Sequence, residues 1–123
     1  MANRDYIVFD FETGSRNPNK TQPTQIAALA LDGRNLAMKG TFNSEIKPIL
    51  DDDKAIAAGL DPIEDGALKV TGKNRTDLAK APALKSVWKK FCSFVDQYNW
   101  KKDPFFNPIP VGFNIIGFDM III

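Results

Sequence analysis

Two acidic residues, Asp10 and Glu12, are spaced so that they could act together. They stand two apart at the end of the apolar run Tyr6–Phe11, so in a strand their side chains leave the same face. Neighbouring carboxylates repel each other unless a cation or hydrogen-bond donors compensate. Mg²⁺ and Mn²⁺ prefer carboxylate oxygens, and a pair of such ions can support phosphoryl transfer. The alternative, favoured on the Asp-x-Glu spacing alone, is that both acids only end the strand and meet Lys or Arg.

Asp119 is the third candidate acid. It follows the strand-like segment Val111–Asn114 and stands among apolar residues, near Gly117, where we expect a helix to begin. Functional residues often collect at such strand-to-helix junctions, and Asn114 could bond backbone at the turn. The competing interpretation is that Asp119 is an N-terminal helix acid favoured by the helix dipole.

Composition limits the other kinds of site. The only cysteine is Cys92 and there is no histidine, which argues against a disulfide framework and against a Cys/His zinc site. Lys plus Arg number 16 and Asp plus Glu 15, for a net charge of +1. Charge therefore neither supports nor excludes a nucleic-acid ligand. The 123 residues, 44% of them hydrophobic, fit one domain with a core of its own.

The first half of the chain predicts three consecutive strands. The run Tyr6–Phe11 is apolar on both faces, as in a central strand covered on both sides. After a loop over Gly14–Thr24, the run Gln25–Leu31 reaches a turn at 32–33, and Ala37–Ile46 favours extended structure. These segments predict an antiparallel meander.

The second half predicts helices and one more strand. Asp61 is expected to cap a short helix that ends near Gly72, and apolar residues at helical spacing over Pro82–Tyr98 predict a long amphipathic helix. The Trp and Phe stripe of that helix is more typical of a core than of a base-stacking surface. A strand is expected over Ile109–Phe113, and the acids of Asp51–Lys54 are interpreted as a solvated turn without function.

Three segments together resemble the DEDD (DnaQ-like) 3′→5′ exonuclease superfamily. YIVFDFETG at 6–14 resembles the first exonuclease motif, and VGFNIIGFDMIII at 111–123 resembles the second. DPIEDGALKVTG at 61–72 is similar to the family's segment in which a helix leads to a glycine close to the nucleotide. Each segment alone would be weak, but the three in this order span nearly the whole chain.

The resemblance implies roles for six residues. Asp10 would bridge two metal ions, Mg²⁺ or Mn²⁺, Glu12 would bind the nucleophile-side ion, and Asp119 would hold the second ion. Thr13, Gly72 and Asn114 would lie at the substrate, with Thr13 offering its backbone to the terminal nucleotide. Phe113 stands where the second motif often has histidine, a position that is not a metal ligand.

The resemblance also implies a fold and an activity. The fold class is α/β: an RNase H-like mixed sheet of five strands with an antiparallel three-strand meander and flanking helices. The activity would be metal-dependent release of nucleoside 5′-monophosphates from single-stranded DNA or RNA 3′ ends. The alternative is a non-catalytic module of the same fold that binds nucleic acid or a protein. We expect a cytoplasmic location, in a bacterium or a phage-infected cell, with no membrane partner.

Residues 1–123 are expected to form a single exonuclease-like domain that is C-terminally incomplete. The family's third motif, with a His or Tyr base and the fourth acid, has no counterpart before Ile123. We therefore expect the fragment itself to be inactive and to self-associate through its exposed C-terminal element.

Overall fold

The computed structural model describes residues 4–99 and 107–112. Between them these residues form four strands and four helices. In chain order the elements are β1 (Tyr6–Thr13), β2 (Pro23–Leu31), β3 (Met38–Glu45), α1 (Asp52–Ala57), α2 (Asp65–Thr71), α3 (Arg75–Ala79), α4 (Leu84–Asp96) and β4 (Ile109–Val111). No helix in these ranges has the length and apolarity to cross a membrane.

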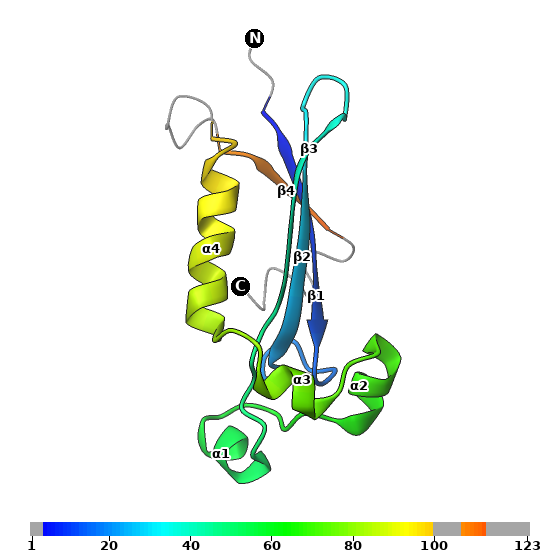
Figure 1. Ribbon diagram of the computed structural model, residues 1–123, viewed down its shortest axis with the longest axis vertical. Helices are drawn as coiled ribbons and strands as arrows, with labels where there is room; N and C mark the ends of the chain where they lie inside the picture. The colour runs from blue at the N-terminus through cyan, green and yellow to red at the C-terminus, as the bar shows by residue number, and fades with distance from the viewer. Residues whose placement is uncertain (1–3, 100–106, 113–123) are drawn as a thin grey trace.

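The strands form one mixed sheet in the order β3-β2-β1-β4 (Figure 1). β1 pairs antiparallel with β2, and β2 pairs antiparallel with β3, which confirms the predicted meander. β4 joins the other edge of β1 in parallel, with Val111 opposite Val8. The chain reaches β4 after α4, because a parallel neighbour requires a long crossover connection.

The main core lies between the sheet and α4, which runs alongside it in Figure 1. Alternate residues of β1 supply one side of this core, and helical spacing brings three residues of α4 to the other. Phe9 and Phe91 are in contact, with ring centroids 6.2 Å apart. Phe91 and Phe94 of the aromatic stripe are therefore core, as predicted, whereas Trp88 is 37% exposed. The buried members are Ile7, Phe9, Phe11, Ile26, Ala28, Ala30, Ile46, Val87, Phe91 and Phe94.

The three short helices gather near the end of β1 (Figure 1). Two of them share a small core of Ile63, Leu68 and Leu78, with Leu50 packed against it. Gly72 ends α2 with φ of 70°, the left-handed conformation that glycine adopts without strain. The predicted C-terminus of α2 is thus confirmed.

The predicted N-terminus of α2 is wrong by about one turn. The helix begins at Asp65, and its N-cap is Glu64, whose side chain makes no capping bond. Asp61 is engaged elsewhere: its carboxylate accepts a hydrogen bond from Ser15 Oγ at 2.9 Å. A partner 46 residues away therefore outcompetes the local cap.

Two further local predictions need correction. The acids at 51–54 are not a simple turn, because Asp51 accepts a hydrogen bond from Lys54 N at 3.0 Å and caps α1. The turn between β2 and β3 is confirmed, but its left-handed residue is Leu36, with φ of 61°, and not Gly33. The backbone bonds Asp32–Ala37 and Leu36–Asp32 fix this longer turn.

Candidate active site

Asp10 and Glu12 lie on the face of β1 that turns away from α4. The residues between and before them, Ile7, Phe9 and Phe11, are buried on the α4 side. Strand alternation therefore places both carboxylates together on the opposite face, as predicted. Asp10 is exposed and Glu12 is half-buried.

Neither carboxylate is neutralised by a described cation. Within residues 4–99 and 107–112, no ion pair or side-chain hydrogen bond involves Asp10 or Glu12. Gln25 stands opposite Glu12 in the β1–β2 register, but its amide donates to Asn43 Oδ1 at 2.6 Å. The interpretation that these acids meet Lys or Arg thus finds no support in the described residues.

The surface is hollowed on both sides of this acidic pair. One hollow of about 650 Å³ includes Asp10, Ala27, Leu29, Thr41 and Asn43 in its lining. The other, of about 680 Å³, lies between the end of β1 and α2, and we call it the β1–α2 groove. Its lining residues are Phe11, Glu12, Thr13, Ser15 and Arg16 on one side and Glu64, Gly66, Ala67, Val70 and Thr71 on the other.

Thr13 and Gly72 both stand at or beside the β1–α2 groove. Thr13 lines it, and the Thr13 hydroxyl donates to Ser15 O at 3.1 Å. The β1–β2 register shifts between Glu12 and Thr13, so the ladder is interrupted beside the acids. Gly72 directly follows the groove residues Val70 and Thr71 at the end of α2.

A set of hydrogen bonds fixes α2 relative to the end of β1. Gly14 O accepts from Glu64 N at 2.9 Å, and Asp61 N donates to Lys20 O at 2.8 Å. Gly14 also lies so close to Ile63 that a Cβ on it would be 2.3 Å from Ile63 Cδ1. A side chain at residue 14 would therefore force the end of the Ile63 side chain to move.

Gln22 joins three segments of the chain near the end of β1. It is 5% exposed, and its Nε2 donates to Asp61 O and Ile49 O, both at 3.1 Å. Its Oε1 accepts from Ile49 N at 2.7 Å. The hydrogen bonds of this buried amide thus all go to backbone, and they hold the segments at residues 22, 49 and 61 together.

Asn114 and Asp119 lie outside the described residues. Gly112, the last described residue, lines the same hollow as Asp10. β4 runs parallel to β1 with Val111 opposite Val8, so β4 is directed toward the Asp10 end of β1. Among the described residues no group of three or more His, Cys, Asp or Glu side chains could hold a metal ion. The proposed third ligand, Asp119, is not among them.

Glu64 and Arg16 line the groove but were not anticipated from the sequence. Glu64 lies in the segment after Asp61 in which a short helix was expected, and Arg16 lies in the expected loop over Gly14–Thr24. No local signal separates them from neighbouring charges, because only the docking of α2 against the end of β1 brings them to one groove.

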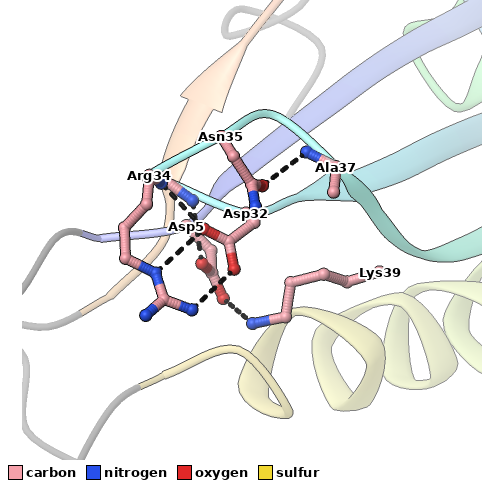
Figure 2. A network of polar contacts seen from close by, with 7 residues as sticks. Asp5, Asp32, Arg34, Asn35, Ala37 and Lys39 are labelled. Carbon is pink, nitrogen blue, oxygen red and sulfur yellow. Dashed lines mark hydrogen bonds and ion pairs between the residues drawn. The ribbon is translucent and has the colours of Figure 1, made fainter.

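A different polar network holds the other end of the sheet, where β2 turns into β3 (Figure 2). Asp5 is 1% exposed, and it accepts from Lys39 Nζ at 2.6 Å and from Gly33 N at 3.1 Å. Arg34 donates to Asp32 from its backbone and its side chain. Hydrogen bonds from the Arg34 side chain, then from its backbone, lower the pKa of Asp32 to about 2.

The chain belongs to the RNase_T exonuclease family, whose model matches residues 7–108. No curated protein sequence matches it significantly. The described fold is that of E. coli exonuclease I. The structure of that enzyme in complex with a dT13 oligonucleotide is similar with a TM-score of 0.72 at 20% identity. The similarity covers 97% of this chain and 22% of that one.

Two further solved structures share the fold. The zinc-bound form of the E. coli exonuclease I complex with single-stranded DNA is similar with a TM-score of 0.72 at 20% identity, covering 97% of this chain and 22% of that one. Cell-death related nuclease 4 (CRN-4) is similar with a TM-score of 0.58 at 21% identity, covering 78% of this chain and 31% of that one. The chain therefore spans less than a third of the length of these structures.

Proposed function

We propose that the protein is a metal-dependent 3′→5′ exonuclease that releases nucleoside 5′-monophosphates from single-stranded nucleic acid. The observation that carries this proposal is the acidic pair Asp10 and Glu12, which shares one face of the central strand beside two hollows and has no described counter-cation. Membership in the exonuclease family supports the reaction class. The exonuclease I structures that share the fold contain single-stranded oligonucleotides, which supports the substrate class.

The donor set fits a hard divalent cation. Carboxylate oxygens that face solvent and lack a cationic partner are the ligands that Mg²⁺ and Mn²⁺ prefer. We assign Asp10, Glu12 and Asp119 as the residues that hold the metal ions. When bound, a pair of such ions would activate the attacking water and stabilise the leaving oxygen.

The chain's own residues would position the substrate. Thr13 lines the β1–α2 groove next to Glu12, where its backbone can meet the terminal nucleotide. Gly72 ends the opposite wall, and Asn114 would approach from the strand beside β1. The buried Gln22 and the Gly14–Glu64 bond keep the two walls at a fixed separation. A preformed groove lowers the entropic cost of holding the scissile phosphate in line.

The test uses the full-length protein, Mn²⁺ and a 5′-labelled single-stranded oligonucleotide. Wild-type protein should release mononucleotides from the 3′ end, and Asp10→Asn or Asp119→Asn should slow this by on the order of a thousandfold, because one metal ligand contributes several kcal/mol. Asp96→Asn, a control on exposed α4 surface, should act like wild type. Wild-type turnover in Asp10→Asn would contradict the site, and binding without cleavage by wild-type protein would favour a non-catalytic module.

Metal binding gives a second measurement that does not depend on turnover. Mn²⁺ should raise the melting temperature of the wild-type protein, because it binds only the native site. The double variant Asp10→Asn with Glu12→Gln should lose that increase. An unchanged increase would place the metal elsewhere.

A further inference from the structure

The charged lining residues of the β1–α2 groove are two acids and one base. Glu12 and Glu64 line it, and Arg16 is its only cationic lining residue in the described part of the chain. A nucleic-acid strand carries one negative charge per phosphate, so the two carboxylates oppose its entry. Metal ions can offset this repulsion only close to the carboxylates that bind them. A phosphate farther along the groove needs a cation from the protein.

The backbone on both sides of Arg16 is anchored. Ser15 is buried; its N–H donates to Thr21 Oγ1 at 3.0 Å, and its hydroxyl donates to Asp61. On the other side, Asn17 O accepts from Thr21 N at 2.8 Å and from Lys20 N at 3.1 Å. Arg16 therefore projects from a fixed point of the loop, although its side chain is exposed.

Arg16 also differs from the other arginines of the chain. Arg34 pairs with Asp32, Arg75 pairs with Asp65, and Arg4 Nε donates to Asn107 O. Arg16 makes no side-chain hydrogen bond or ion pair with any residue in 4–99 or 107–112. A guanidinium left available in this way can donate two parallel hydrogen bonds to a phosphate.

We propose that Arg16 is a substrate-binding residue that holds a backbone phosphate of the single strand whose 3′-terminal nucleotide enters the β1–α2 groove. This inference rests on the proposed function and adds a specific protein–phosphate contact to it. The contact acts on a phosphate, so it strengthens binding without selecting a base.

The test measures binding of a fluorescent single-stranded oligonucleotide to the full-length protein in Ca²⁺, over a range of salt concentrations. The oligonucleotide is checked afterwards to confirm that it has not been cleaved. Arg16→Ala should raise the Kd roughly tenfold at low salt. It should also reduce the slope of log Kd against log salt by about 0.7, the value for one phosphate of a single strand. Arg16→Lys should restore the slope but only part of the affinity, because an ammonium group cannot donate the two parallel hydrogen bonds that a planar guanidinium donates.

Arg34→Ala is the matched control, since it removes the same charge at the opposite end of the sheet. It should leave both the Kd and the slope unchanged. If Arg16→Ala binds with wild-type Kd and slope, or if Arg34→Ala changes them equally, the assignment of Arg16 is overturned while the proposed function stands. If wild-type protein does not bind the oligonucleotide, the proposed function fails and the Arg16 contact fails with it.

Discussion

The two ends of β1 use carboxylates in opposite ways. Asp5, directly before the strand, is 1% exposed and is held by Lys39 and by a backbone N–H. Asp10 and Glu12, near its other end, face a hollowed surface without a described partner. A buried charge is tolerated only when it is paired and hydrogen-bonded. Carboxylates left without described partners on an open face remain free to bind a ligand, which is the difference expected between a structural acid and the proposed metal ligands.

Removing one acid from each end of β1 tests this difference with the largest expected effect. Asp5→Ala should lower the free energy of unfolding by about 2 kcal/mol, because it leaves the Lys39 ammonium and the Gly33 N–H without their acceptor. Asp10→Ala should change it by less than about 0.5 kcal/mol. Urea denaturation of both variants gives the two numbers. A larger loss in Asp10→Ala would show that Asp10 is structural.

A smaller effect is expected where β1 meets α2. Gly14→Ala should cost about 1 kcal/mol, because the new methyl group forces Ile63 Cδ1 to move. Ile63→Val removes that carbon, so Gly14→Ala should cost clearly less in the Ile63→Val background. The four proteins form a double-mutant cycle that denaturation can measure. Additive costs would mean that the close approach to Ile63 does not limit residue 14.

The smallest effect concerns Asp32, at the paired end. Its pKa is lowered from 3.8 to about 2 in the folded state, so its stabilisation is present above the unfolded value and is lost as pH falls toward about 2. Asp32→Asn should therefore melt below wild type at pH 6, and the difference should shrink as pH falls from about 4 toward 2. Calorimetry at several pH values tests this. A difference of the same size at pH 2 as at pH 6 would not come from the carboxylate charge.

Much of the fold follows from local patterns. The meander, α4 and the end of α2 at Gly72 were all predictable, because strand alternation, helical spacing and a left-handed cap are each set within a few residues. The start of α2 was not, since Asp61 bonds Ser15, 46 residues away, in place of its own helix. The helix α3, capped by Asn74, was missed because five residues are too few for a periodic signal.

The shared face of the two acids follows from the sequence alone. Asp10 and Glu12 must share a face because side chains alternate along a strand, whatever packs around it. Their lack of a described counter-ion depends on the tertiary structure. So does the docking of α2 beside them, which makes a groove containing Glu64 and Arg16. Periodicity reports which face a side chain takes, whereas partners and grooves depend on which distant segments meet. At this site, hydrogen bonds of Gly14, Gln22 and Asp61 hold together segments that are far apart in the chain.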